Sequence, residues 1–281
     1  MDDPVVRALD GLVPGGVRRG ELRRGSRVLR WVEAGSGGPA VVLDASLGQP
    51  GSLAWAGVLP SVAARTRVIA YDRAGTGMSE PALPLTLDGQ VGDVTALIES
   101  TGERCVLAGH SWGGLLAQLA ARKHPALFAG LVLVDPADER FRASLSPVDT
   151  FRPFARRLSA DPRLQSLILD AYAACYAERS QAQMVQDENR LFAGSVPVLR
   201  QARVSAALPE VAVTILSATT GMPEGQRDSL TGFHAELAAT APGSRHVVLP
   251  DTGHLIPQVR PEPVAEAINL VIEEARQAGN R

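Results

Sequence analysis

Short, almost continuously apolar runs recur along this chain, and segments with helical periodicity separate them. Strands that helices cover on both faces of a parallel sheet have this composition, whereas half-exposed strands alternate polar and apolar residues. The clearest apolar runs are residues 40–43, 68–71, 105–108, 131–134, 211–216 and 246–249. They predict an α/β fold with a mostly parallel sheet flanked by helices. Segments 17–23 and 27–33 alternate more strongly and predict an antiparallel edge.

The stretch from residue 137 to residue 204 interrupts this rhythm. It has no clear strand pattern and consists of helical fragments separated by prolines. We therefore expect a core domain formed by residues 1–136 and 205–281, with residues 137–204 inserted as a helical cap or lid. Aromatic residues are concentrated in this insertion, which contains Phe141, Phe151, Phe154, Tyr172, Tyr176 and Phe192. These side chains either pack the insertion onto the sheet or line an apolar substrate pocket beneath it.

The composition is that of a globular protein, with 45% hydrophobic residues, 21% charged residues and a net charge of −2. Such a chain can bury a substantial core, and it lacks the basic surplus that nucleic-acid or acidic membrane partners require. The two cysteines, Cys105 and Cys175, and the five histidines have no zinc-ligand spacing. We therefore expect no metal, no cofactor, no disulfide and no nucleic acid, and a small molecule as the partner.

No run of about 18 apolar residues occurs, so the sequence predicts no membrane span. The first residues, Met-Asp-Asp-Pro, are acidic and no apolar block follows them, unlike a secretory signal. A cytoplasmic location is the expectation. The sequence carries no signal for an oligomeric state.

The pentapeptide at residues 109–113, Gly-His-Ser-Trp-Gly, follows the apolar run 105–108 directly and opens a helix. A serine hydroxyl is a weak nucleophile unless it is exposed, aligned with a base and close to donors for an oxyanion. A sharp turn from strand to helix exposes Ser111, and glycines at 109 and 113 avoid collisions across that turn. The helix also directs its first amides toward developing negative charge. These features make Ser111 the candidate nucleophile.

With this motif the chain resembles the α/β-hydrolase family, in its serine esterase, lipase and lactonase branch. The resemblance extends from about residue 28 to residue 275. Residues 71–79 are similar to the family's D-x-R-G-x-G-x-S loop, and Trp55 matches a packing position; the resemblance gives both a structural role. It implies the α/β-hydrolase fold, with a mostly parallel eight-stranded sheet flanked by helices and a helical cap inserted after the sixth strand.

Position distinguishes the five histidines. His254 follows the last predicted strand in a Gly-His pair and precedes the final helix, and the family places its general base there. A loop at the carboxyl edge of the sheet can also reach the serine. The other histidines are expected to be structural or to point away from the nucleophile: His110, His124, His234 and His246.

The candidate acid departs from the commonest family pattern. Most members carry it a few residues after the penultimate strand, where this chain has no carboxylate before Glu224. Asp135 instead ends the strand that follows the nucleophile strand, in an Asp-Pro-Ala similar to that of pancreatic-type lipases. A carboxylate there can orient the imidazole and stabilise the imidazolium. We favour Asp135 over Glu224, and we interpret Asp251 as a residue that shapes the loop before His254.

An acyl-transfer site needs two main-chain donors for the oxyanion. The amide that follows the nucleophile belongs to Trp112. The second donor is expected in the loop at residues 44–51, which resembles the family's oxyanion loop and in which Leu47 has the corresponding position. The serine at 46, where relatives have glycine, leaves the register open by one residue.

The sequence therefore predicts a serine hydrolase that cleaves a carboxylic ester, lactone or thioester of a small, largely apolar substrate. Ser111 would form the acyl-enzyme, His254 would act as general base and Asp135 would orient it. The alternatives are a non-hydrolytic ligand-binding member, and an acyltransferase or C–C hydrolase that uses the same triad. Epoxide hydrolysis and dehalogenation are disfavoured, because those relatives carry an aspartate in place of Ser111.

Overall fold

A computed structural model of the chain describes residues 3–140, 151–177 and 179–279, and leaves out the side chains of residues 151–152, 179–182 and 224. The strands are β1 (Arg18–Arg24), β2 (Arg27–Ala34), β3 (Val41–Asp44), β4 (Val68–Asp72), β5 (Cys105–His110), β6 (Phe128–Val134), β7 (Ala212–Ala218) and β8 (Arg245–Leu249). They form one eight-stranded sheet in the order β1-β2-β4-β3-β5-β6-β7-β8. The β1–β2 and β2–β4 pairs are antiparallel and the remaining pairs are parallel, which confirms the predicted edge and the predicted parallel sheet.

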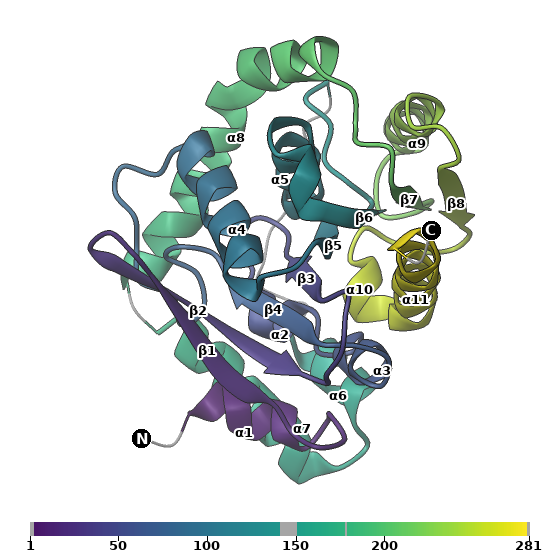
Figure 1. Cartoon of the computed structure of the whole chain (residues 1–281). Helices are drawn as coiled ribbons and strands as arrows, with labels where there is room; N and C mark the ends of the chain where they lie inside the picture. Colours follow the sequence, from purple (N-terminus) through teal and green to yellow (C-terminus); the bar gives the residue numbers. More distant parts are fainter. Residues whose placement is uncertain (1–2, 141–150, 178, 280–281) are drawn as a thin grey trace.

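Helices cover both faces of this sheet (Figure 1). They are α1 (Pro4–Asp10), α2 (Gly51–Ala54), α3 (Leu59–Ala63), α4 (Leu87–Thr101), α5 (Trp112–Lys123), α6 (Phe151–Leu158), α7 (Pro162–Cys175), α8 (Arg179–Ser205), α9 (Glu224–Ala239), α10 (Ile256–Val259) and α11 (Pro261–Gly279), with a short 3₁₀ helix at Pro125–Leu127. In Figure 1, α4, α5, α8 and α9 lie on one side of the sheet, and α3, α10 and α11 lie on the other. Along the chain, the three helices α6–α8 come between β6 and β7, where the sequence predicts the helical insertion.

The central strands divide their side chains between two cores, because successive residues of a strand point to opposite faces. In β5, Val106 and Ala108 join the core under α11, whereas Cys105 and Leu107 join the core under α4 and α5. Both faces of these strands are therefore buried, which explains their continuous apolar runs. The two cysteines are buried free thiols.

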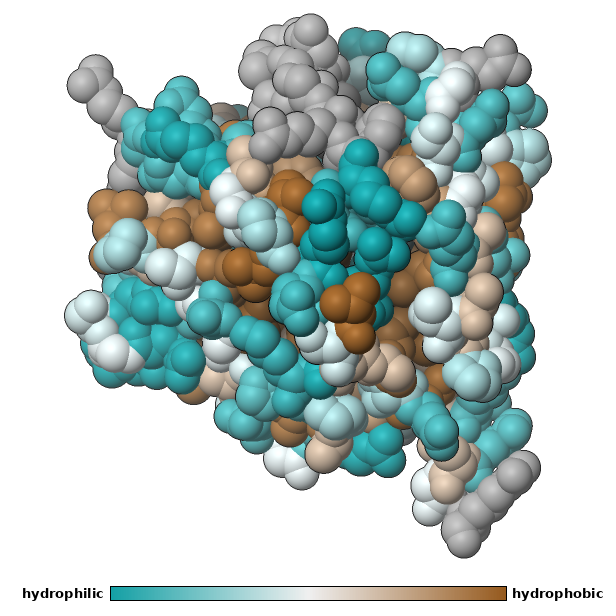
Figure 2. Space-filling model, turned by 90° about the horizontal axis from the view of Figure 1, so that it is seen from above, coloured by the Kyte–Doolittle hydropathy of each residue, from teal (hydrophilic) through white to brown (hydrophobic). Residues whose placement is uncertain are grey.

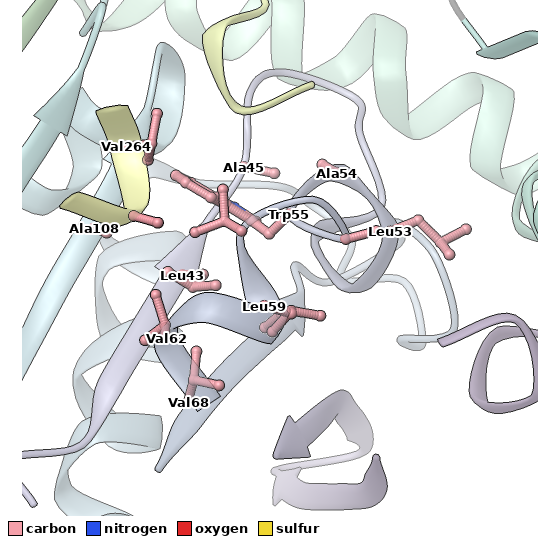
Figure 3. Packing of buried hydrophobic residues seen from close by; sticks show 14 of the residues in the cluster. Leu43, Ala45, Leu53, Ala54, Trp55, Leu59, Val62, Val68, Ala108 and Val264 are labelled. Atoms are coloured by element: carbon pink, nitrogen blue, oxygen red, sulfur yellow. The ribbon is translucent and has the colours of Figure 1, made fainter. Parts of the chain in front are cut away.

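Trp55 is fully buried in the first of these cores. Figure 3 shows its ring among the side chains of Leu43, Ala45, Leu59 and Val264, which come from β3, its following loop, α3 and α11. The ring therefore fills the space between the sheet and the helices near the end of β3. The packing role implied by the family resemblance agrees with this environment.

On the surface, hydrophilic residues are interspersed with smaller apolar areas over the face that Figure 2 shows. The large apolar side chains that are exposed in the described ranges are scattered: Leu83, Val198, Val204, Val247, Val248 and Leu270. None of the helices that the structure describes is long and apolar enough to cross a membrane.

Candidate active site

Ser111 lies at the sharp turn between β5 and α5. Its backbone has a φ of 54° and a ψ of −113°, a conformation that side-chain-bearing residues rarely adopt and that is typical of strained functional turns. The flanking glycines permit it. A Cβ atom on Gly113 would lie 2.5 Å from the carbonyl oxygen of Asp44 and 2.7 Å from that of Ala45, and one on Gly109 would overlap the main chain of Gly113. The predicted strand–turn–helix context of the pentapeptide is thus present.

His254 lies in the loop after β8 and reaches across the edge of the sheet to Ser111. Its Nε2 atom is 3.0 Å from the Oγ of Ser111, and its Nδ1 atom is 2.6 Å from Oδ2 of Asp135. A carboxylate only accepts hydrogen bonds, so Nδ1 of His254 carries a hydrogen and donates a hydrogen bond to Asp135. Nε2 is then the acceptor of the serine hydroxyl. The structure brings together the three side chains that the sequence singled out.

Asp135 is fully buried at the carboxyl end of β6, with a φ of 40°. Besides the bond from His254, its Oδ1 accepts a hydrogen bond from the main-chain amide of Ala218 at 3.0 Å. The Nη1 atom of Arg227 lies 2.9 Å from Oδ1 and 3.0 Å from Oδ2. Each carboxylate oxygen therefore has donors that fix its orientation toward the imidazole.

This environment keeps Asp135 ionised. Burial alone would raise the pKa of its carboxyl, but the hydrogen bond and charge of His254, followed by the charges of Arg227 and His234, hold the pKa well below its usual range. Arg227 comes from α9 and is itself buried. Nothing in the sequence distinguishes Arg227, because one arginine in a polar helix resembles any solvated arginine.

Among the described residues, Asp135 is the carboxylate that His254 contacts. Glu224 is the first residue of α9, and its side chain lies outside the described part of the structure. Asp251 is exposed and has a φ of 53° in the loop before His254, in agreement with a loop-shaping role.

Two of the other histidines, His110 and His234, lie beside the site. His110 donates from Nε2 to the carbonyl oxygen of His254 at 2.8 Å, and burial, followed by the charge of His254, lowers the pKa of His110 to about 3. His234 donates from Nε2 to the carbonyl oxygen of Pro136 at 2.8 Å. His110 and His234 thus hold the main chain next to His254 and Asp135, in agreement with the structural role expected for His234.

The loop that follows β3 lies against the first turn of α5. The amide of Gly113 donates to the carbonyl oxygen of Ala45 at 3.1 Å, which brings this loop next to the nucleophile turn. Within the described residues, the amides of Leu47 and Trp112 donate to no acceptor, whereas the amide of Gly48 is bonded to Glu188. The N–H groups of Leu47 and Trp112 are therefore available as donors to a ligand at this turn.

The aromatic residues of the insertion have different surroundings. Phe154 and Tyr172 pack edge to face with ring centroids 6.0 Å apart. Phe192 packs in the same manner on Trp112 at 5.2 Å, and the hydroxyl of Tyr176 donates to the carbonyl oxygen of Gly48 at 2.8 Å. The side chains of Phe141 and Phe151 lie outside the described residues. Phe154 and Tyr172 thus have a packing role, whereas Phe192 and Tyr176 lie beside the candidate site.

In the part of the chain that the structure covers, no group of three or more His, Cys, Asp or Glu side chains is arranged to hold a metal ion. The chemistry available at the turn is that of a serine, an imidazole and a carboxylate in hydrogen-bonded sequence.

The sequence profile of the alpha/beta hydrolase family matches residues 34–267, most of the chain. The chain belongs to the alpha/beta hydrolase family. It is 28% identical to the lipase LipV of Mycobacterium tuberculosis over 224 residues, 72% of this chain and 81% of the relative. It is 30% identical to the 2-hydroxymuconate semialdehyde hydrolase of Pseudomonas sp. (strain CF600) over 221 residues, 73% of this chain and 75% of the relative.

Solved structures share the fold. The crystal structure of Cfl2 from Burkholderia cenocepacia has a TM-score of 0.71 at 22% identity and covers 92% of this chain and 96% of that chain. A serine hydrolase involved in carbazole degradation, CarC, has a TM-score of 0.68 at 17% identity and covers 92% of this chain and 99% of that chain. Similarity at this level shows the common architecture.

For some relatives the alignment covers a small share of their length. Three further relatives are matched over 35%, 5% and 40% of their own length. The second of these is the polyketide synthase ThaQ of Burkholderia thailandensis, to which the chain is 33% identical over 125 residues.

Proposed function

We propose that this alpha/beta hydrolase is a serine hydrolase that cleaves a carboxylic ester, lactone or thioester of a small, largely apolar substrate. The observation that carries the proposal is the continuous hydrogen-bonded series from Ser111 Oγ to His254 Nε2 (3.0 Å) and from His254 Nδ1 to Asp135 Oδ2 (2.6 Å). Relatives named lipase and hydrolase support the reaction class.

In the first half of the reaction, Ser111 attacks the substrate carbonyl while His254 Nε2 takes the hydroxyl proton. The imidazolium that forms is stabilised by the anionic Asp135, to which Nδ1–H remains bonded. The main-chain amides of Leu47 and Trp112 donate to the oxyanion of the tetrahedral intermediate. His254 then returns its proton to the leaving group, and the acyl-enzyme on Ser111 remains.

In the second half, His254 takes a proton from water, and the resulting hydroxide attacks the acyl carbonyl. The same two amides bind the second oxyanion. Collapse of this intermediate releases the carboxylic acid, and Ser111 recovers its proton from His254. Every step uses side chains and amides that lie together at the carboxyl edge of the sheet, and none requires a cofactor.

The insertion at residues 137–204 is proposed as the cap that covers this site, on the core formed by residues 1–136 and 205–281. Phe192 of α8 packs on Trp112, and Tyr176 contacts the loop after β3, so cap side chains reach both segments that surround Ser111. Apolar cap side chains at this place favour a substrate with an apolar acyl or leaving group.

The proposal is tested with p-nitrophenyl esters of increasing acyl length, together with lactones and thioesters, using the purified full chain. We expect turnover of at least one class, and a loss of at least about 1,000-fold in the Ser111→Ala variant. A Ser100→Ala variant provides the matched control, because Ser100 lies near the end of α4 and bonds only the main chain there. Equal turnover by the wild type and the Ser111→Ala variant would contradict the proposal.

A second candidate is acyl transfer to an acceptor other than water. The chain is 30% identical over 243 residues to the dihydrolipoyllysine-residue acetyltransferase component of an acetoin-cleaving system from Pseudomonas putida, 83% of this chain and 63% of the relative. The same acyl-enzyme would serve both reactions. Adding alcohols or thiols to the ester assay distinguishes them, because a transferase forms the new ester or thioester in preference to the free acid.

A further inference from the structure

Glu188, from the cap helix α8, is fully buried and is surrounded by hydrogen-bond donors. Its Oε1 accepts from Nε of Arg73 at 2.7 Å and from Nε2 of Gln90 at 2.6 Å. Its Oε2 accepts from the main-chain amide of Gly48 at 2.6 Å and from Nη2 of Arg73 at 3.1 Å. One cap carboxylate thus joins the loops after β3 and β4 to helix α4.

Arg73 continues this network along the loop after β3. Its Nη1 donates to the carbonyl oxygen of Ala45 at 2.7 Å, and its Nη2 donates to the carbonyl oxygen of Ser46 at 2.7 Å. The oxygen of Ser46 and the N–H of Leu47 belong to one peptide group, in which they point in opposite directions. Binding of that oxygen by the guanidinium therefore turns the Leu47 N–H away from Arg73, and it also polarises the N–H as a donor.

The neighbouring peptide is held from two sides by the cap. The N–H of Gly48 bonds to Glu188, and the carbonyl oxygen of Gly48 accepts from the hydroxyl of Tyr176. These bonds occupy the amide of Gly48 and leave that of Leu47 available. The amide of Gly48 is thereby excluded as the donor, which agrees with the position that the sequence favours at Leu47.

Gln90 connects the carboxylate of Glu188 to Trp112, the second candidate donor to the oxyanion. The Oε1 of Gln90 accepts from the indole N–H of Trp112 at 2.9 Å, while its Nε2 donates to Glu188. An indole N–H only donates and a carboxylate only accepts, so the orientation of the amide of Gln90 is fixed by its partners. The side chain of Trp112 is thus held by a hydrogen bond to Gln90. The main-chain amide of the same residue is the one that follows Ser111.

The network requires a negative charge at position 188. All four contacts of Glu188 are donors, and a glutamine there would turn an NH₂ group toward two of them. Arg73 is buried and also donates to Oδ1 of Asp44 at 2.6 Å. Burial lowers the pKa of Arg73, but Glu188 and Asp44 raise it above its ordinary value, so the guanidinium stays charged.

We propose that Glu188 and Arg73 are positioning residues for the oxyanion hole, so that a side chain of the cap sets the orientation of the donors at Leu47 and Trp112. This inference rests on the proposed serine hydrolase function. It gives the cap a role in transition-state stabilisation in addition to covering the substrate. A misplaced donor is costly, since displacements of about 1 Å lower rates about 100-fold.

The test compares the rate at which a fluorophosphonate probe modifies Ser111 in the wild type and in the Glu188→Gln variant. The phosphoryl oxygen of the probe occupies the oxyanion hole during the attack, so the rate depends on its donors. We expect a decrease of about 10- to 100-fold at every pH, with the acid limb of the pH profile unmoved because His254 and Asp135 are untouched. A purely structural role would not produce this combination.

Asp187→Asn is the matched control, because Asp187 is the preceding residue of α8 and pairs only with groups of that helix. This variant should react within about two-fold of the wild type. Circular dichroism and thermal unfolding establish that each variant is folded. Should Glu188→Gln fail to fold, Arg73→Lys carries the test. It retains the charge, but one ammonium group cannot serve all five oxygens that the guanidinium contacts, and the same decrease is expected.

The outcomes separate the two proposals. If the probe does not modify Ser111 of the wild type, the proposed function fails. If the wild type is modified and a folded Glu188→Gln or Arg73→Lys protein reacts at the wild-type rate, the proposed function stands and the positioning role is overturned.

Discussion

Arg227 and Asp135 form a buried ion pair on the same carboxylate that accepts the hydrogen bond of His254. Burial of an arginine is costly unless its charge is compensated, and Asp135 provides that compensation. Nε and Nη2 of Arg227 have no partner among the described side chains, so its contact with Asp135 is the dominant one. The carboxylate is therefore shared between a permanent cation and the imidazole.

Removal of this cation should change the pH dependence of catalysis. Asp135 also faces His234 at 3.9 Å, but burial lowers the pKa of His234, so Arg227 is the permanent positive charge there. In an Arg227→Gln variant, the Asp135 carboxylate would lose its permanent counter-charge, and its negative charge would act on the neighbouring imidazole uncompensated. We expect the acid limb of kcat/KM to move up by about one pH unit. Arg245→Gln, a surface arginine paired with Glu274, should leave the limb in place; a limb that is unmoved in both variants would contradict this.

Replacement of Asp135 distinguishes the two candidate acids. Asp135→Asn should lower kcat by about 10⁴-fold, because the amide can hold the imidazole in the wrong tautomer and carries no charge to stabilise the imidazolium. Glu224→Gln should keep kcat within about two-fold. Both are measured on the best p-nitrophenyl ester, with thermal unfolding as the check on folding. Full activity of Asp135→Asn, together with loss of activity in Glu224→Gln, would assign the acid to Glu224.

His110 should make the stability of the fold depend on pH. Its pKa falls from 6.5 to about 3 on folding, so between these values the unfolded chain binds a proton that the folded chain does not. Stability must therefore decrease as the pH falls through this window, by up to about 1.4 kcal/mol per pH unit for this group. His110→Gln keeps a donor for the carbonyl of His254 but does not titrate. Urea unfolding at pH 4.5, 5.5 and 7 should show a weaker pH dependence for the variant, and identical slopes would refute the assignment.

The turn around Ser111 should not tolerate side chains at its glycines. In Gly113→Ala, the new Cβ would meet the main-chain oxygens of Asp44 and Ala45, which cannot move without displacing the loop after β3. We expect a loss of about 1 to 3 kcal/mol in the free energy of unfolding, with a slower reaction of Ser111. Gly232→Ala, in open space within α9, should instead stabilise the protein by up to about 1 kcal/mol. Equal effects of the two substitutions on thermal unfolding would rule out the steric explanation.

Much of the architecture could be predicted from local sequence. Strands buried on both faces need continuous apolar runs, so the central strands were found, although β6 begins at Phe128 rather than 131 because Ala129 and Gly130 weaken the apolar pattern. Likewise β7 extends to Ala218, past the predicted end at 216. Ser111 and His254 could be recognised because each lies in a short segment whose position after a strand is informative.

The residues that support the site could not be predicted in the same way. Arg227 contacts Asp135 across 92 positions of sequence, and Glu188 contacts Arg73 across 115. A buried charge and a solvated charge look alike in a helical sequence, and only the tertiary fold shows which carboxylate meets which guanidinium. The family resemblance implies a structural role for the segment that contains Arg73. The bonds from Arg73 to Ala45 and Ser46 show which part of the molecule it holds, namely the loop after β3.

The most direct measurement is the mass of the protein after reaction with a fluorophosphonate probe, followed by mapping of the modified peptide. If the chain is a serine hydrolase of the proposed kind, one phosphonyl group is added per chain, on Ser111, and the Ser111→Ala variant is not modified. The reaction should also slow by orders of magnitude in His254→Ala, because the hydroxyl then has no base. An unmodified wild-type protein, or modification at a residue other than Ser111, would contradict the proposed mechanism.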